Sequence, residues 1–334
     1  METIVLFTDT HFGVKNNSMT WLNSQLDFIY KQLIPDLKKM KEEMDPIRDQ
    51  LTLIHLGDVF DSRSTISTYV ATKVREAFSD LKQVVDQFNI VAGNHDFYSP
   101  NSDEVCSIDL LLSGLKINLF TQESYLSNNG DLFLPWYQYQ DTKNINQLIE
   151  NGSVNRIFTH ADIVTEKVPY IGVPIFSGHL HTPDINPDLN RYNLGSCYPL
   201  TFADANNHRG YYILKNKGWK FIPNIQSIQF WRLYDEDIFD IYNQYIKTKD
   251  YIELYISETN MSDPKYVEKL NFFTQTYKNI WIIPQTGLGS DYELEKFEGY
   301  DIEKITKKMI PTELKSKFEV VLNSCNKSLI MKNE

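Results

Sequence analysis

The chain has 334 residues, of which 42% are hydrophobic and 13% aromatic, so it can bury at least one large core, and general intrinsic disorder is excluded. The 33 Lys and Arg residues are outnumbered by 44 Asp and Glu residues, and the formal charge of −11 excludes a protein that holds nucleic acid by bulk electrostatics. Phosphate chemistry on such a chain needs local positive charge, for which bound metal ions are the obvious source.

The first two thirds of the chain alternate short apolar runs with helical patterns. Each run is rich in β-branched or aromatic residues and leads into a polar cluster, as strands of an α/β fold do. Three later runs follow one another without helices, which predicts antiparallel pairing among them. The predicted strands are residues 4–7, 51–54, 90–92, 156–158 and 173–176, then 191–194, 211–214 and 219–222, and the predicted helices are residues 21–33 and 70–85.

A second unit is predicted to begin near Phe230. Residues 251–256 alternate as a strand does, Ser262-Asp263-Pro264 supplies capping residues for a helix to about Tyr277, and residues 280–283 form another strand. Residues 284–290 have linker composition, and two amphipathic stretches broken at Pro311 follow them.

The cysteines and the apolar runs limit the cellular setting. Cys106, Cys197 and Cys325 lie far apart without CxxC spacing, so we expect buried, reduced thiols. No apolar run reaches the ~18 residues of a membrane span, and the opening segment does not resemble a signal peptide. We therefore expect no membrane association and a reducing cytoplasm, of a bacterium or of the host of a phage.

Polar clusters follow the first five predicted strands, where each strand ends. Because sites in α/β sheets assemble at the carboxyl ends of strands, these clusters can converge on one cleft. Carboxylate, imidazole and amide oxygen suit Mn, Fe or Zn, and the absence of thiolates argues against a structural zinc site. The clusters are Asp9-Thr10-His11, Gly57-Asp58, Gly93-Asn94-His95-Asp96, His160 and Gly178-His179-Leu180-His181.

Two of the seven histidines lie outside this series. His55 falls within the second strand and is interpreted as a hydrogen-bonded core or edge residue, and His208 lies in a polar loop and is expected to be solvated. The other five occur at strand ends, and five independent accidents of that kind are not credible.

The motif series resembles the calcineurin-like metallophosphoesterase superfamily. Asn-His-Asp in the third motif points away from the protein Ser/Thr phosphatases, which usually have Asn-His-Glu. The segment Gly195-Ser-Cys-Tyr-Pro-Leu-Thr-Phe202 is similar to the Gly-Ser-x-x-Pro-Leu-Ser-Phe segment of the SbcD-type nucleases, a group that includes nucleases of T-even phages and of eukaryotic meiotic recombination. The motifs cover roughly residues 1–222.

This resemblance implies a four-layer α-β-β-α sandwich with a small α+β capping domain and C-terminal helices. The implied domains are residues 1–228 for the nuclease, 229–286 for a DNA-binding cap and 291–334 for docking an ATPase. It also implies two divalent ions, with manganese expected and magnesium as the alternative, that supply hydroxide to attack phosphorus. The implied ligands are Asp9, His11 and His181 for one ion, Asn94, His160 and His179 for the other, and Asp58 as the bridge.

Two implied roles concern the chemistry itself. His95 would act as the general acid that protonates the leaving sugar oxygen. We hypothesise that the Asp61 carboxylate hydrogen-bonds His95, fixes its tautomer and raises its pKa, although an Asp that only makes a turn is an alternative. Thr159 stands before His160 where the superfamily often has glycine, which makes His160 the least secure ligand.

The resemblance further implies a Mn-dependent DNA nuclease, endonucleolytic or 3′–5′ exonucleolytic. Two copies of the nuclease would form a homodimer, and this homodimer would bind an SMC-like SbcC-type ATPase. DNA contacts could come from Lys15, Asn16, Asn17 and Arg63, or from Phe97 and Tyr98, although solvated loops and core packing explain these residues equally well. The C-terminal helices could dock the ATPase or pack on their own domain. A small-molecule phosphodiesterase or phosphatase, and a metal-bound scaffold for the ATPase, remain the alternative functions.

Overall fold

Two six-stranded sheets form the centre of the N-terminal unit, which comprises residues 1–285. The first has the order β14-β13-β1-β2-β3-β6, and the second has the order β11-β12-β10-β9-β8-β7. The computed structural model describes residues 2–99, 101–137, 146–147, 149–164, 172–215, 218–235, 246–257, 260 and 262–285. The linker expected at residues 284–290 is wrong for Pro284 and Gln285, which belong to the strand Asn279–Gln285. Its remaining residues 286–290 and the expected docking segment at residues 291–334 lie outside the described residues.

The strands of the first sheet lie where the apolar runs predict them. The strands β1, β2, β3 and β6 are parallel, and β13 and β14 add an antiparallel hairpin beside β1. The bounds are β1 Glu2–Phe7, β2 Gln50–His55, β3 Gln87–Val91, β6 Asn118–Phe120, β13 Gly210–Lys215 and β14 Gly218–Pro223.

The second sheet contains the remaining predicted strands. Here β8, β9, β10 and β12 are parallel, with antiparallel β7 and β11 at the edges. The bounds are β7 Tyr125–Leu126, β8 Asp131–Leu134, β9 Arg156–Thr159, β10 Ile175–Ser177, β11 Asp184–Asn186 and β12 Arg191–Asn193. The expectation that residues 191–194 pair with the two strands after them is therefore wrong. This run joins β10 in parallel, because the hairpin β11–β12 returns the chain along the second sheet.

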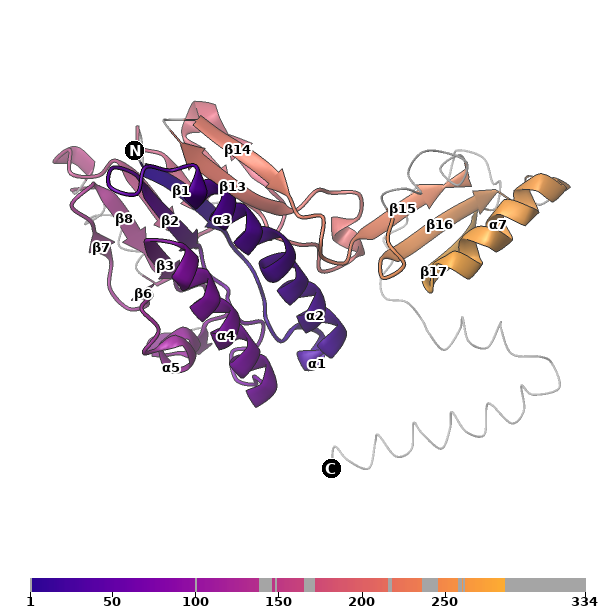
Figure 1. Cartoon of the computed structure of the whole chain (residues 1–334), viewed down its shortest axis with the longest axis horizontal. Helices are drawn as coiled ribbons and strands as arrows, with labels where there is room; N and C mark the ends of the chain where they lie inside the picture. Colours follow the sequence, from indigo (N-terminus) through magenta and orange to yellow (C-terminus); the bar gives the residue numbers. More distant parts are fainter. Residues whose placement is uncertain are drawn as a thin grey trace. The chain divides into compact units, whose positions relative to one another are not determined.

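Helices cover the outer face of the first sheet (Figure 1). In α4, Val70, Val74, Phe78 and Leu81 are fully buried at the spacing that predicts a helix, and Ser67 caps its first turn by accepting a hydrogen bond from Val70. The predicted helix at residues 21–33 is confirmed. It consists of α2 and a π-helical turn, which leads directly into α3. The helices are α1 Val14–Asn17, α2 Met19–Phe28, the π turn Ile29–Leu33, α3 Ile34–Glu42, α4 Thr68–Val84 and α5 Ser107–Leu112.

Alternation along the strands builds three apolar layers. Val5 and Leu53 face the helices, whereas Ile4, Leu6 and Ile54 face the second sheet and pack with Phe158. A third cluster, which includes Ile157, lies on the far face of the second sheet. The protein is thus an α/β sandwich with stacked sheets, as expected from the motif series.

A smaller sheet follows the sandwich and has parallel strands in the order β15-β16-β17. Asp263 caps α7 with Pro264 in its first turn, as predicted from the sequence. The bounds are β15 Phe230–Tyr234, β16 Tyr251–Ser257, α7 Pro264–Thr276 and β17 Asn279–Gln285. Trp21 of α2 stacks on Phe230 and Tyr251, which packs this sheet against the sandwich.

The remaining elements are short. A two-stranded ribbon, β4 Phe97–Ser99 and β5 Ser102–Cys106, follows the third motif, and single 3-10 turns lie at Pro187–Leu189 and Phe202–Asp204. Cys106 and Cys197 are buried free thiols, as expected, whereas Cys325 lies outside the described residues.

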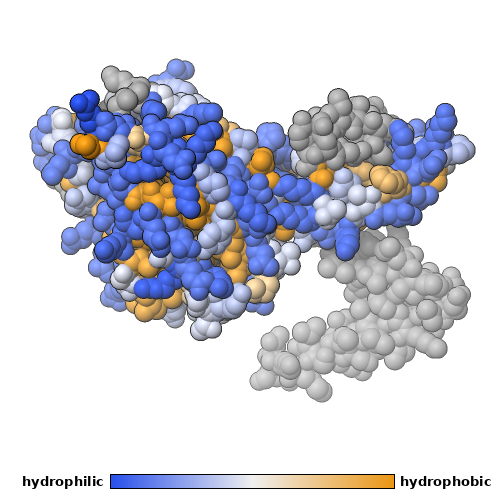
Figure 2. Space-filling model, viewed as in Figure 1, coloured by the Kyte–Doolittle hydropathy of each residue, from blue (hydrophilic) through white to orange (hydrophobic). Residues whose placement is uncertain are grey.

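Among the described helices, none combines the length and the apolar composition that crossing a bilayer requires. Figure 2 shows a largely hydrophilic face with scattered apolar groups, which is ordinary for a folded domain.

Candidate metal centre

The loops after β1 and β2 hold each other in a strained conformation. The amide of Asp9 donates to the Gly57 carbonyl at 3.0 Å, and the amide of His11 donates to the Asp58 carbonyl at 3.1 Å. Asp9, His11 and Asp58 have φ angles of 53°, 39° and 55°, a left-handed region that costs non-glycine residues of the order of 1–3 kcal/mol each. Strain concentrated at adjacent strand ends indicates that a function maintains it.

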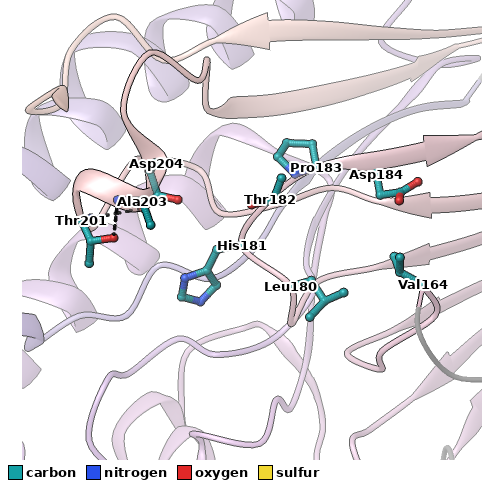
Figure 3. Close-up of a pocket in the computed structure, with 9 residues that line it drawn as sticks. All are labelled: Val164, Leu180, His181, Thr182, Pro183, Asp184, Thr201, Ala203 and Asp204. Atoms are coloured by element: carbon teal, nitrogen blue, oxygen red, sulfur yellow. Dashed lines mark hydrogen bonds between the residues drawn. The ribbon is translucent and has the colours of Figure 1, made fainter. Parts of the chain in front are cut away.

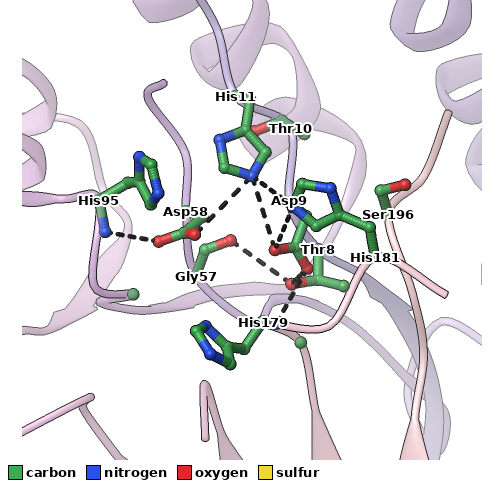
Figure 4. A network of polar contacts seen from close by, with 12 residues as sticks. Thr8, Asp9, Thr10, His11, Gly57, Asp58, His95, His179, His181 and Ser196 are labelled. Atoms are coloured by element: carbon green, nitrogen blue, oxygen red, sulfur yellow. Dashed lines mark hydrogen bonds and ion pairs between the residues drawn. The ribbon is translucent and has the colours of Figure 1, made fainter. Parts of the chain in front are cut away.

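The first cluster consists of Asp9, His11 and His181. Oδ1 of Asp9 lies 3.7 Å from Nε2 of His11 and 3.7 Å from Nε2 of His181. The two imidazole Nε2 atoms lie 3.0 Å apart and point toward the same region (Figure 4). Three potential ligand atoms from two sheets therefore converge within the reach of one ion.

The second cluster consists of Asp9, Asp58 and His160. Nε2 of His160 lies 3.2 Å from Oδ2 of Asp58 and 4.0 Å from Oδ1 of Asp9. Nδ1 of His160 donates to the Leu56 carbonyl at 2.6 Å, so Nε2 is directed at the carboxylates. The structure places His160 in this cluster with threonine before it in place of glycine.

Asn94 and His179 lie beside the second cluster. Nδ1 of His179 donates to Oδ1 of Asn94 at 2.9 Å, and the ring of His179 is 5.5 Å from that of His160 between centroids. The amide of His179 donates to Oδ2 of Asp9 at 3.3 Å. In this arrangement the amide oxygen of Asn94 faces His179, whereas Asp9 contributes to both clusters.

The donor set suits divalent cations. Oδ1 of Asp9 and Nε2 of His160, both turned into the clusters, are buried without a hydrogen-bond partner within the described part of the chain. Buried polar atoms are otherwise almost always paired, so these two atoms fit the role of metal ligands. Oxygen and imidazole nitrogen atoms without thiolate suit Mn and similar first-row ions.

Mutual attraction between carboxylates and imidazoles governs the protonation of this centre. Burial raises the pKa of Asp58, but the neighbouring His160 outweighs it and holds that pKa below its ordinary value. Burial lowers the pKa of His160, but the Asp58 charge dominates and raises it to about 9. Burial lowers the pKa of both His179 and His181. In the metal-free chain a proton on His160 therefore partly replaces the positive charge of an ion.

His95 stands next to the centre, and its contact with Asp61 differs from the hypothesis. Nδ1 of His95 donates to the main-chain carbonyl of Asp61 at 2.6 Å, whereas the Asp61 carboxylate lies 3.6 Å from Nδ1 of His11. The amide of Asp61 donates to the Phe12 carbonyl, and this fixes the loop with its own carbonyl toward His95. The hypothesis that the Asp61 carboxylate hydrogen-bonds His95 is therefore wrong. The amide of His95 donates to Asp58 at 2.8 Å, which connects the general-acid candidate to the centre.

Several positioning residues were not predicted from the sequence. Asp96 accepts hydrogen bonds from the amides of Val59, Phe60 and Gly93, although it lies within the third motif. Burial and the charge of Asp58 raise the pKa of Asp96 to about 7. Gln25 of α2 donates to the carbonyls of Thr10 and His11, and no motif marks it.

His55 and His208 are as expected. His55 is fully buried and hydrogen-bonds Thr10 at 2.9 Å, and burial lowers its pKa to about 3. It accepts from the amide of Gly57, so it supports both strand-end loops as a neutral residue. His208 is exposed.

The candidate DNA-contacting residues differ in their exposure to solvent. Lys15 and Asn16 are exposed, and Arg63 is half-buried. Oδ1 of Asn17 accepts from the amide of Ser67, so this side chain has a structural role. Phe97 is fully buried and packs against Tyr137, whereas Tyr98 is 63% exposed.

A cavity of about 410 Å³ opens beside His181 (Figure 3). It lies between His181 of the first cluster and the 3-10 turn after Thr201, where Asp204 accepts hydrogen bonds from the amides of Leu200 and Thr201. Its lining is Val164, Leu180, His181, Thr182, Pro183, Asp184, Thr201, Ala203 and Asp204. Of the Gly195–Phe202 segment, Thr201 thus lines the space next to the centre.

Comparisons with known proteins identify a family and two similar nucleases. The sequence model of the calcineurin-like phosphoesterase family matches residues 2–308. Exonuclease subunit 1 of Enterobacteria phage T4 is 26% identical over 235 residues, which cover 65% of this chain and 66% of that protein, slightly under two thirds of its length. The Pseudomonas putida nuclease MPE is 16% identical, with 53% of this chain and 61% of that chain covered and a TM-score of 0.28.

Proposed function

Because this chain belongs to the calcineurin-like phosphoesterase family, we propose that it is the nuclease subunit of an SbcCD-type DNA repair or recombination complex. It would hydrolyse phosphodiester bonds of DNA with two divalent ions, manganese being the expected one. The observation that carries the proposal is the pair of His/Asp clusters that share Asp9 and contain buried ligand atoms without partners.

The proposed ligands follow from the two clusters and their edge. Asp9, His11 and His181 would hold one ion, and His160, Asn94 and His179 would hold the other. Asp58 would bridge them, since its Oδ2 lies 3.2 Å from Nε2 of His160 and 3.7 Å from Nε2 of His11. When bound, two such metal ions lower the pKa of a water molecule and neutralise charge that develops on phosphoryl oxygens.

His95 is proposed as the general acid. Its Nδ1 proton is held by the Asp61 carbonyl, so Nε2 remains for the leaving oxygen of the substrate. Its ring is 5.1 Å from that of His11 between centroids, close enough for a phosphate at the centre to reach both. Asp61 acts on His95 only through its main chain, and its carboxylate is proposed to orient His11.

The preference for DNA as the substrate rests on the relative that is named an exonuclease subunit. The acidic chain must obtain its phosphate contacts locally, and Lys15 and Arg63 near the first two motifs are proposed to supply them. The cavity beside His181 would receive the part of the substrate next to the scissile phosphate.

The word subunit in the name of that relative supports a partner protein for this chain. We propose an SMC-like ATPase, docked by residues 291–334, on a homodimer of the nuclease. Residues 1–228 would form the nuclease domain, and residues 229–286 a cap that contacts DNA.

A nuclease assay tests the proposal. A labelled DNA strand is incubated with the chain in Mn or Mg, with and without the cognate ATPase, beside bis(p-nitrophenyl) phosphate. We expect manganese-dependent DNA degradation that the His95→Ala variant loses. Turnover of the small ester without DNA cleavage would indicate a small-molecule phosphodiesterase, and metal binding without any hydrolysis would indicate a scaffold.

A further inference from the structure

The space between the two large sheets changes from apolar to polar along the strands. Near the carboxyl ends, Ile54 and Val91 pack against the second sheet. Because residues two apart on a strand face the same side, Thr52 and Asn89 face this space one step earlier, toward the amino ends. Hydrophobic residues would stabilise the sandwich better at these positions, so the polar side chains require another explanation.

These side chains line a cavity of about 260 Å³. Thr52 is 3% exposed and Asn89 is 4% exposed. Oγ1 of Thr52 is buried and has no hydrogen-bond partner among the residues that the structure describes. A buried hydroxyl without a partner is destabilising, which indicates that the cavity receives a hydrogen-bonding molecule.

Two asparagines form a paired amide surface in the cavity. Asn89 and Asn118 are cross-strand partners on β3 and β6, and Nδ2 of Asn118 donates to Oδ1 of Asn89 at 2.8 Å. The amide group of Asn89 still has its N–H donors, and Asn118 still has its carbonyl oxygen, for which no partner occurs in the described part of the chain. The pair therefore offers a donor and an acceptor to a ligand.

Aromatic rings also line the cavity. Phe120 stacks on Phe133 with centroids 4.4 Å apart and on Tyr125 with centroids 5.2 Å apart. Tyr125 is 50% exposed, so it lies at the entrance of the cavity. Tyr125 and Phe133 cover the two faces of Phe120, so a flat ligand ring would stack on the half-exposed Tyr125.

The charges in the cavity exclude ionic ligands. Glu2 and Asp131 also line it, and both pair with Arg156, at 2.8 Å and 2.6 Å. The pair of carboxylates exceeds the single guanidinium by one negative charge, which repels phosphate, and both carboxylates are already engaged, which leaves none for a cation.

We propose that this cavity is a binding site for a neutral purine, with adenosine as the representative ligand. The remaining acceptor of Asn118 and donor of Asn89 match N6 and N7 of adenine, and Tyr125 accepts the face of the base. The volume suits a ligand smaller than a drug molecule. Thr52 and Asn89 lie on the amino halves of strands whose carboxyl ends lead to the metal centre. The proposal therefore does not depend on the proposed nuclease function.

Calorimetric titration of adenosine into the full chain tests the site. EDTA in the buffer removes divalent ions, so the metal centre does not contribute. We expect saturable binding of one adenosine per chain, and binding of adenosine 5′-monophosphate at least about tenfold weaker, because its phosphate meets Glu2 and Asp131. Absence of adenosine binding at millimolar concentration overturns the proposal, as does equal binding of the monophosphate.

Matched threonine variants locate the binding. Thr52→Val replaces the hydroxyl by a methyl group and is expected to weaken the binding of adenosine about 2- to 10-fold, which corresponds to one neutral hydrogen bond. Asn89→Leu is expected to weaken it at least about tenfold. Thr3→Val is the control, because Thr3 is a strand residue that is 4% exposed and does not line the cavity. Equal effects of Thr52→Val and Thr3→Val, or no effect of Thr52→Val, would show that adenosine binds elsewhere.

Discussion

Nε2 of His160 lies 3.2 Å from Oδ2 of Asp58, and both side chains are almost completely shielded from solvent. The Leu56 carbonyl holds the other ring nitrogen of His160, so the imidazole cannot turn away from the carboxylate. This contact joins the two sheets, because Asp58 follows β2 and His160 follows β9. It is also the contact that metal binding must replace.

Asp58→Asn should reduce manganese affinity by more than the 10- to 100-fold that loss of a supporting residue causes, because a bridging charge is lost. The same variant should make the metal-free chain no less stable at high pH, since it removes one of two adjacent buried carboxylates. Thermal unfolding with EDTA and with manganese measures both effects. Asp188→Asn, at an exposed position of the 3-10 turn Pro187–Leu189, is the control. A manganese-induced shift of the same size in Asp58→Asn and in the parent chain would contradict the bridging role.

Manganese binding should release protons and should strengthen as pH rises. His160 has its pKa raised to about 9 in the metal-free chain, so at pH 7 it must lose a proton before it can coordinate an ion. Affinity should rise by up to about tenfold per pH unit for each released proton between pH 6.5 and 8.5. Titration calorimetry in buffers of different ionisation enthalpy measures this release. A pH-independent affinity would contradict it.

The raised pKa of His160 has the opposite effect on the stability of the metal-free chain, which falls as the pH rises. The stabilisation that protonated His160 gains from Asp58 is fully present below pH 6.5, its unfolded pKa, and is lost as the pH rises through about 9. In EDTA, the unfolding midpoint of the parent chain should therefore fall over this window. The His160→Asn chain should lose that part of the slope.

His95→Ala should lower the turnover of DNA by about 10²- to 10⁴-fold, which is the usual effect of removing a general acid. Manganese should still raise the unfolding temperature of this variant, because His95 is not among the proposed ligands. Single-turnover cleavage combined with a thermal shift separates the two. If the variant kept its turnover, or lost manganese binding together with activity, the assigned role would be wrong.

Asp61→Asn should change metal binding more than proton transfer. Its main-chain carbonyl, which holds His95, is retained, whereas the carboxylate that faces His11 at 3.6 Å loses its charge. Manganese affinity should fall about 10- to 100-fold, as for other residues that orient a ligand. At saturating manganese, the pH profile of turnover should match that of the parent chain. A shifted profile with unchanged affinity would restore the carboxylate contact with His95.

The local character of most elements could be predicted from the sequence, because apolar periodicity and capping act within a few residues. The spacing of Val70, Val74, Phe78 and Leu81 predicts α4, and Asp263-Pro264 predicts the start of α7. The convergence of Asp9, His11, Asp58, His160, His179 and His181 follows from the rule that sites form at the carboxyl ends of strands.

Tertiary structure alone decided which strands are neighbours and which atoms of a residue face the centre. Residues 191–193 join β10 rather than the later hairpin, because pairing depends on how hairpins and crossovers return the chain. Asp61 presents its carbonyl to His95 because a distant hydrogen bond to Phe12 sets the loop. In the sequence, nothing distinguishes Thr52 and Asn89 from other strand residues. The stacking of the two sheets encloses them in one cavity. Periodicity reports which face of an element is buried, whereas these arrangements depend on contacts between residues far apart in the chain.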